Sequence, residues 1–385
     1  MKRHLFLIAF LIAFCLVLGA IAVMTIKTSA SSLREPQDPQ APQRDREDGE
    51  TAGFLGSRSP HGKIVIANRA SGTISVIDAA SDRTIGTYAL PADTKTPEPM
   101  YVVYSRDRVF VGDRANNRVA VFNPRTFTVE ATVPAGAGIW HMWTDPFDRQ
   151  LWVNNDIDKT CTVIDPRTLQ VLATVATPAD LAAAGGKPHD VILDPATGQF
   201  AYVTLIGVTG PVDYVIKYST QTFTEVDRAA VGKDPHLSAT SRNNLLYVPC
   251  QNSNVVMVLN RDTLDQATAI DVPGAHGAGM NFEGSVFYTT NLPGGGSDGL
   301  WTISTASNTV ASQPVDTPFP TPHNIALTPD RGAFFPQTRG NRKLYLTHSG
   351  ATANQVTIYK LKGSLPDFHK TITVGFNPFG LTFVP

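Results

Sequence analysis

The chain has 385 residues, of which 42% are hydrophobic and 17% are charged, and its formal net charge at pH 7 is −1. This length is sufficient for one large core or two ordinary ones. The near-neutral charge argues against a general polyanion-binding protein, because neutralising phosphates requires a basic surface. Nucleic acid is therefore not an expected partner.

The N-terminal segment, residues 1–30, carries Lys2 and Arg3 ahead of an apolar run over residues 5–26. At ~1.5 Å per residue, a helix of this length spans a hydrocarbon core of about 30 Å. A secretory signal usually has an apolar region of only about 7–15 residues, although small residues at 28–30 would also suit cleavage. The segment predicts either a signal-anchor helix that stays in the membrane or a long signal peptide. In both cases the remainder of the chain is exported, to the periplasm or the extracellular space.

Residues 31–59 are rich in proline, glutamine and charged side chains, with little to bury. This composition is typical of a disordered linker. As a flexible coil it would hold a folded domain roughly 30 Å from a membrane, and such a spacer favours the anchor. Beyond it the chain has only Cys161 and Cys250, which are too few for a disulfide framework.

From residue 60 to residue 385 one pattern of four short strands recurs. The predicted second strands read KIVIAN, RVFVGD, QLWVNN, QFAYVTL, NLLYVPC, SVFYTTN and GAFFPQ, and they end at Asn68, Asp113, Asn155, Leu205, Cys250, Asn291 and Gln337. Seven such copies are typical of an all-β, seven-bladed β-propeller. The C-terminal NPFGLTFVP has the pattern of a first strand, so we expect it to complete the N-terminal blade. Residues 179–184 predict at most one turn of helix.

The words YVP, YVT, FYTTN and VNN in the second strands, together with VID after the following loop, resemble the YVTN-type β-propeller repeat. The resemblance extends over residues 61–385 and is specific for the fold. It implies much less about function, because this repeat family serves binding, scaffolding and several enzymes.

The innermost strand of each blade should line the central channel, with the preceding loop on the top face. When the segments that lead into these strands are aligned on their P-H words, a single position is occupied by Met100, His141, His189, His236, His276, His323 and Phe379. Five of the nine histidines of the chain thus share one predicted structural position.

Two interpretations of this column remain open. The histidines are either inherited structural residues of the repeat or ligands of a transition metal, because neutral imidazoles suit copper, iron and zinc. The Met100 thioether favours copper, with iron as the alternative. The seven-bladed nitrous oxide reductase and carotenoid oxygenases, which hold metals through axial histidines, are similar in outline, but the chain lacks a separate electron-transfer copper domain. No nucleotide fingerprint or C-x-x-C-H haem motif is present, so neither nucleotide nor covalent haem is expected.

Several residues flank the predicted channel. Trp140 precedes His141 and offers a stacking surface, whereas strand alternation should turn Asp190 away from His189. A predicted insertion over residues 338–354 in the last blade is a candidate lid that carries His348. The top-face loops also supply arginines that offer a grip for an anionic ligand: Arg69, Arg114 and Arg339.

Three functional hypotheses follow. The first is an exported, monomeric propeller that binds copper or iron for redox chemistry or metal handling, with a redox partner at the top face. The second is a metal-free propeller that recognises a protein, a glycan or nucleic acid. The third is a lactonase-like or lyase-like enzyme with one axial histidine as the base. Whether the chain is an enzyme is left open by these alternatives.

Overall fold

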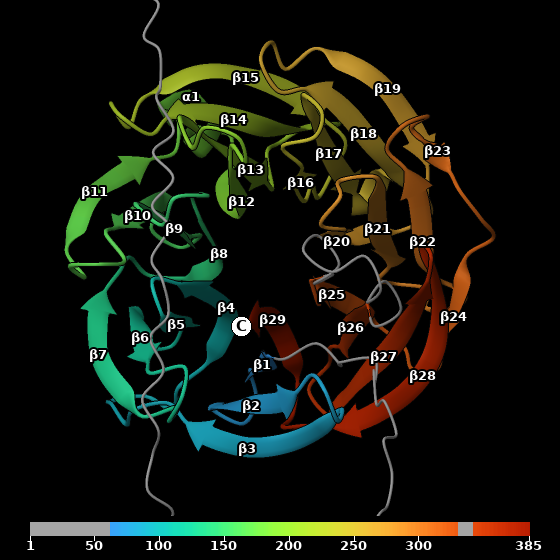
Figure 1. Cartoon of the computed structure of the whole chain (residues 1–385). Coiled ribbons are helices and arrows are strands. Elements are labelled where there is room, and N and C mark those ends of the chain that lie inside the picture. The colour runs from blue at the N-terminus through green and yellow to red at the C-terminus, as the bar shows by residue number, and fades with distance from the viewer. Residues whose placement is uncertain (1–61, 330–341) are drawn as a thin grey trace, which may run out of the picture. The chain divides into compact units, whose positions relative to one another are not determined.

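The repeated strands form seven antiparallel sheets around one axis in the computed structural model, which describes residues 62–329 and 342–385 (Figure 1). The prediction of an all-β, seven-bladed propeller is confirmed. The predicted turn of helix is also present, as α1 (Ala179–Ala183). The expected membrane segment and linker lie outside the described residues. Within the described ranges, no helix is long and apolar enough to cross a membrane.

Each blade is described from its innermost to its outermost strand. The first four blades consist of β29 (Pro378–Val384), β1 (Lys63–Asn68), β2 (Thr73–Asp78) and β3 (Arg83–Ala89); β4 (Pro99–Ser105), β5 (Arg108–Asp113), β6 (Arg118–Phe122) and β7 (Val129–Pro134); β8 (Ile139–Thr144), β9 (Leu151–Asn155), β10 (Thr160–Ile164) and β11 (Val171–Ala176); and β12 (Lys187–Leu193), β13 (Phe200–Ile206), β14 (Asp213–Ser219) and β15 (Glu225–Val231).

The last three blades consist of β16 (Ser238–Ala239), β17 (Leu245–Cys250), β18 (Val255–Asn260) and β19 (Gln266–Asp271); β20 (Ala275–Met280), β21 (Val286–Asn291), β22 (Gly296–Ser304), β23 (Thr309–Val310) and β24 (Val315–Thr317); and β25 (Pro322–Leu327), β26 (Lys343–His348), β27 (Gln355–Lys362) and β28 (Leu365–Thr373).

Burial within a blade follows from its place between two neighbouring blades. The second strands are apolar along almost their whole length because both of their faces are covered, as in β1, where every residue after Lys63 is buried. The outermost strands β7, β11 and β19 are mostly exposed and contribute one fully buried residue each, Val133, Val175 and Ile270. The core is therefore a set of apolar layers between blades, arranged around the channel.

The turns after the third strands repeat one capping device. The side chains of Asp165 and Asn260 each accept hydrogen bonds from the backbone amides two and three residues later. These hydrogen bonds form Asx turns. The turns fix the third strand against the fourth and leave the innermost strand free to carry the site.

The first blade combines strands from two distant parts of the chain. β29 pairs antiparallel with β1, from Lys63 opposite Val384 to Asn68 opposite Pro378. The innermost position of this blade is therefore occupied by the C-terminal strand, which brings Phe379 to the same level as the histidines.

The seventh blade corrects one sequence-based assignment. The predicted second strand GAFFPQ lies outside the described residues, and the second position is occupied instead by β26, which pairs with both β25 and β27. His348, predicted to belong to a lid, is the last residue of β26 and is fully buried. The YLTH pattern of β26 was missed because spacing placed the strand about ten residues too early.

Candidate functional site

A β-bulge in the innermost strand determines which side chains reach the channel. In the fourth blade, Pro188 pairs with Leu205 but Val191 pairs with Val203, so three steps on β12 oppose two on β13. The innermost strands β4, β8, β20, β25 and β29 contain the same irregularity. An inserted residue breaks strict alternation. Two consecutive side chains can therefore face the axis.

The strand register corrects the alignment of the histidines. Pro99 and Ile139 pair with the last residue of their second strands, Pro188 pairs with the last but one, and the bulge follows directly after each of them. The next residue on each innermost strand is therefore structurally equivalent: Met100, Trp140, His189, His236, His276, His323 and Phe379. This position holds four histidines rather than five. His141 lies one residue further along, level with Tyr101, Asp190 and Asn324.

Six aromatic side chains at this position form a closed ring across the channel, called here the axial ring. It consists of Trp140, His189, His236, His276, His323 and Phe379. Successive ring centroids lie 5.6, 4.7, 3.8, 4.7 and 4.2 Å apart, and Phe379 closes the ring against Trp140 at 5.8 Å. Met100, the seventh residue of the set, is fully buried in β4.

Burial keeps three imidazoles of the ring uncharged. The pKa values of His189, His276 and His323 lie well below the usual value, first because burial disfavours the charged form and then because neighbouring imidazoles repel a proton. His276 is held by a 2.6 Å hydrogen bond between its Nδ1 and Oε1 of Gln251. His189, His276 and His323 thus present neutral nitrogen atoms.

Three of these nitrogen atoms have no partner. Nε2 of His189, His236 and His276 is buried without a hydrogen bond to any described residue. A buried polar atom left unpaired costs about 1–3 kcal/mol. Water or a shared bound group could satisfy these three neighbouring atoms.

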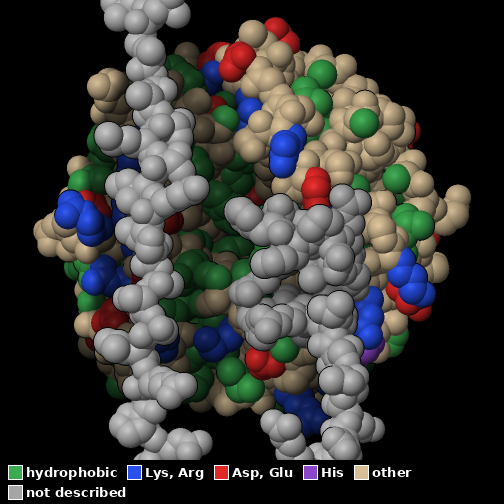
Figure 2. All heavy atoms as spheres, viewed as in Figure 1, with side chains coloured by type: hydrophobic (Ala, Val, Ile, Leu, Met, Phe, Trp, Pro, Cys, Tyr) green, Lys and Arg blue, Asp and Glu red, His purple; other side chains and the backbone are tan. Residues whose placement is uncertain are grey.

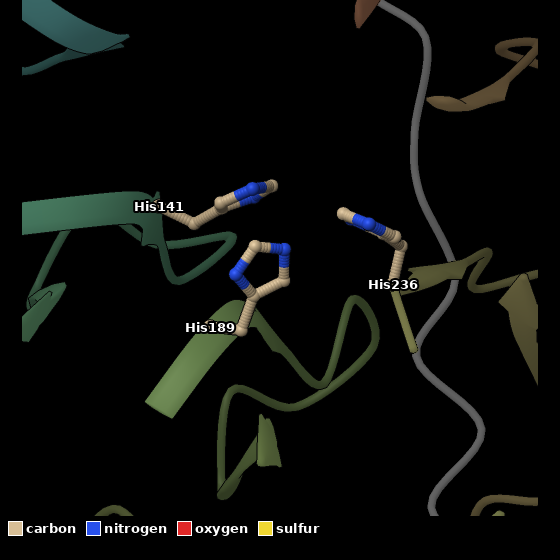
Figure 3. A group of neighbouring side chains, drawn as sticks. All are labelled: His141, His189 and His236. Atoms are coloured by element: carbon tan, nitrogen blue, oxygen red, sulfur yellow. The ribbon is translucent and has the colours of Figure 1, made fainter. Parts of the chain in front are cut away.

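His141 joins the axial ring from below. Its imidazole lies 4.9 Å from that of His189 and 5.5 Å from that of His236, measured between centroids. One nitrogen from each of these three histidines lies within 4.8 Å of the others. Figure 3 shows the three rings converging from β8, from β12 and from the segment just before β16. This trio is the group of side chains best placed to share a ligand.

Asp190 connects two of the three histidines. Its carboxylate lies 2.7 Å from Nδ1 of His141 and 3.7 Å from Nδ1 of His236, and it accepts a 2.9 Å hydrogen bond from the Leu237 amide. Burial alone would raise the pKa of Asp190, but the two imidazoles hold it well below its usual range. The expectation that Asp190 faces away is therefore wrong, because the bulge turns both His189 and Asp190 inward.

Tyr101 continues the hydrogen-bond chain across the channel. Its hydroxyl lies 2.7 Å from Nε2 of His141 and 2.8 Å from Oδ1 of Asn324. The phenol has a single proton, so it donates to one of these atoms at a time. Burial and then the Asp190 charge raise the pKa of Tyr101 well above its usual value, which keeps the phenol protonated. Tyr101 and Asn324 each come directly after a member of the aligned column. Both were missed from the sequence because side chains were assumed to alternate strictly along the strand.

The arginines predicted to grip an anion are engaged within the protein. Arg69 and Arg114 stack on the Trp140 ring with their guanidinium carbons 5.5 and 4.7 Å from its centroid. They also form ion pairs with Glu98 at 2.6 Å and Asp156 at 2.9 Å. Both therefore cover the axial ring from the top face. Arg339 lies outside the described residues.

His348 lies apart from this group. Its Nε2 is 2.9 Å from the Thr357 hydroxyl, and its Nδ1 is 3.1 Å from the Pro320 carbonyl oxygen. Burial lowers the pKa of His348 to about 4. Both nitrogens are used within the seventh blade, so His348 is a structural residue of the core rather than part of a lid.

A cavity of about 610 Å³ extends from the axial ring toward the bottom face, where the innermost strands end. Its ceiling includes Tyr101, His141, Asp190 and Asn324, and its walls are mainly apolar. Figure 2 shows hydrophobic side chains around the central hollow. The polar chain that ends at Tyr101 is therefore accessible to a small molecule in this space.

Solved structures that resemble this chain share its fold at low sequence identity. Hydrazine synthase from Kuenenia stuttgartiensis is 16% identical, with a TM-score of 0.60, over 76% of this chain and 91% of that one. A Bacteroides uniformis protein provisionally assigned as a 6-phosphogluconolactonase is 17% identical, with a TM-score of 0.63, over 84% and 100%. The dihydro-heme d1 dehydrogenase NirN, in complex with DHE, is 14% identical, with a TM-score of 0.56, over 89% and 77%.

Sequence comparison assigns the family. No curated protein sequence matches the chain. Residues 19–268, more than half of the chain, match the family described as lactonase, seven-bladed β-propeller. The seven blades found in the structure agree with that description. The chain therefore belongs to the lactonase, seven-bladed β-propeller family.

Proposed function

We propose that this chain is an exported propeller of YVTN-type repeats that binds a transition metal ion at the axial histidines. Copper is the first candidate and iron the second. His141, His189 and His236 form the primary ligand set, with His276 and His323 adjacent to it in the ring. Membrane attachment through residues 5–26 and a role in redox chemistry or metal handling belong to the same proposal.

The observation that carries the proposal is the unpaired nitrogen atoms. Nε2 of His189, His236 and His276 is buried without a hydrogen-bond partner among the described residues, and burial keeps the imidazoles of His189 and His276 neutral. Neutral imidazole nitrogens are good ligands for copper, iron and zinc. An ion held by His141, His189 and His236 would give coordinate bonds to two of these unpaired atoms, those of His189 and His236.

Asp190 supports the same interpretation. In metalloproteins, the second ring N–H of a histidine ligand usually donates a hydrogen bond to a carboxylate, a backbone carbonyl or water, which fixes the tautomer and the direction of the ring. The 2.7 Å contact between Asp190 and Nδ1 of His141 has this form and leaves Nε2 of His141 as the coordinating atom. In the metal-free site that atom is held by the Tyr101 hydroxyl. Tyr101 would therefore release it on binding.

Metal content tests the proposal directly. The chain should be isolated from an oxidising compartment without a polyhistidine tag, and its metals measured by elemental analysis. We expect close to one copper or iron per chain, lost in His189→Ala and in His236→Ala. His369→Ala is the matched control, because His369 lies in β28 outside the site and contacts Asp82 at 3.4 Å. A metal-free chain after copper loading, or metal content unchanged in both site variants, would overturn the proposal.

A second candidate function is hydrolysis of a lactone, favoured by family membership and by the hydrogen-bonded Asp190, His141 and Tyr101 at the cavity ceiling. A carboxylate-oriented imidazole is a common general base. In this case the metal-free chain would release acid from aldonolactones in a pH-stat assay, and Asp190→Asn would abolish the release. Asp271→Asn on the exposed strand β19 is the control. Absence of turnover in the unmodified chain would exclude this candidate.

A further inference from the structure

The cavity below the axial ring has an apolar wall with one polar end. Side chains such as Val102, Met142, Ile192, Leu237 and Ile325 line it along the innermost strands. A space of this size with mainly apolar walls and a few convergent polar groups has the character of a small-molecule site. Its polar lining residues include Tyr101 and Asn324 at the ceiling, next to the histidines, and Thr240 and Asn281 further along the cavity.

Two large side chains at the lower end of the cavity are unusually exposed. Trp143 and Phe282 both line it and have 51% and 58% of their surface accessible. Trp143 lies near the end of β8, and Phe282 comes just after β20, so the two belong to different blades. Exposed aromatic residues gathered around a cavity are typical of a surface that contacts an apolar ligand. These two side chains give the lower end of the cavity an exposed aromatic surface beside polar lining residues such as Asn281.

The charge of the lining is also restricted. Among the described residues that line the cavity, Asp190 is the only one with a formal charge, and none is a lysine or arginine. An anionic ligand would lose its hydration without gaining a cationic partner, and the Asp190 carboxylate would repel it. The arginines of the top face are separated from this space by the axial ring. Phosphate esters and carboxylates are therefore disfavoured.

The ceiling offers hydrogen bonds to an uncharged polar group. The Tyr101 hydroxyl and the Asn324 carboxamide both face the cavity, 2.8 Å apart. The Tyr101 proton can turn from Asn324 or His141 toward a ligand oxygen. A hydroxyl or carbonyl group on an otherwise apolar molecule would satisfy this end of the cavity.

We propose that the cavity binds a small, uncharged, mainly apolar organic molecule, with one oxygen hydrogen-bonded to Tyr101 and Asn324 beneath the axial ring. The proposal does not depend on a bound metal, because it rests on the wall, the lower end and the charge of the cavity. If the ring does hold a metal, this molecule would lie next to it.

A pair of probes with the same apolar body tests the proposal on the full-length chain. 1-Naphthol and 1-naphthyl phosphate differ in the charged group, and calorimetric titration measures both. We expect saturable binding of 1-naphthol with one molecule per chain, at least tenfold tighter than 1-naphthyl phosphate. Equal or tighter binding of the phosphate would overturn the charge argument. Absence of saturable 1-naphthol binding would overturn the site.

A filling variant locates the probe. Ala278 lines the cavity from β20, so Ala278→Phe should weaken 1-naphthol binding at least tenfold. Ala267→Phe places the same ring on the exposed outer strand β19 and should leave binding unchanged. Equal binding by the two variants would overturn the location. The two-probe comparison on the unmodified chain decides the matter even if Ala278→Phe does not fold. Metal content measured on the same samples separates failure of this site from failure of the metal proposal.

Discussion

Replacing Asp190 by asparagine tests whether this carboxylate organises the axial histidines. Oδ1 of Asp190 lies 2.7 Å from Nδ1 of His141, and Oδ2 accepts a 2.9 Å hydrogen bond from the Leu237 amide. Asparagine has nearly the same shape but only one acceptor oxygen. Its NH₂ group must therefore face either the His141 N–H or the Leu237 N–H, so one donor opposes another.

The expected cost follows from these contacts. A hydrogen bond to a charged group contributes about 1.5–3 kcal/mol, and a buried donor left unpaired costs about 1–3 kcal/mol. We therefore expect Asp190→Asn to lower the free energy of unfolding by about 3 kcal/mol. The control Asp271→Asn removes a charge from exposed strand β19 and should change it by less than about 0.5 kcal/mol.

Urea denaturation of the metal-free chain, followed by tryptophan fluorescence, measures this difference. The pKa of Asp190 is lowered in the folded state, so its stabilising contribution is present above the unfolded pKa of about 3.9 and is lost as the pH falls further. The difference in free energy of unfolding between wild type and Asp190→Asn should therefore be constant above pH 5 and decrease below pH 4. If Asp190→Asn and Asp271→Asn unfold alike at pH 7, Asp190 does not hold the histidines.

Three further changes have defined outcomes. Tyr101→Phe removes the hydroxyl bonded to His141 and Asn324 and should cost about 1–2 kcal/mol in urea denaturation; an unchanged midpoint would mean that these bonds contribute nothing. Gly277→Ala places a methyl group against the His323 backbone carbonyl and should cost about 2–3 kcal/mol, a result that wild-type stability would contradict. His348 has a folded pKa of about 4, so below its unfolded pKa of about 6.5 the unfolded chain takes up a proton that the folded chain does not. Between pH 7 and pH 5 this group should remove about 2 kcal/mol of stability. This loss of stability should be absent in His348→Gln. If the stability of wild type and of His348→Gln depended equally on pH, the prediction would be refuted.

The blade count was predictable because it depends on spacing. Strands such as KIVIAN and RVFVGD recur at intervals close to the length of one blade, and their continuous apolar character reflects burial between neighbours. β1 and β5 have the bounds read from the sequence. In the last blade the same reasoning failed, because β26 lies further along the chain than the average spacing predicts.

The composition of the site was less predictable than its location. The P-H words led correctly to the innermost strands, but the position of His141 depends on a bulge that becomes visible only in the pairing of β8 with β9. The same type of bulge brings Asp190 to face the axis beside His189. Local alternation carries no information about such insertions. Tyr101 and Asn324 were missed for this reason.

Anomalous X-ray scattering at the copper absorption edge, from crystals of the copper-loaded chain, tests the central claim most directly. The account predicts one strong peak at the axial ring, about 2.0–2.1 Å from a nitrogen of His189 and of His236, the length of a zinc–imidazole bond. The Asp190 carboxylate should remain hydrogen-bonded to His141. A copper-loaded crystal without a peak at the axial ring, with the three Nε2 atoms bonded to water or to protein groups, would contradict it.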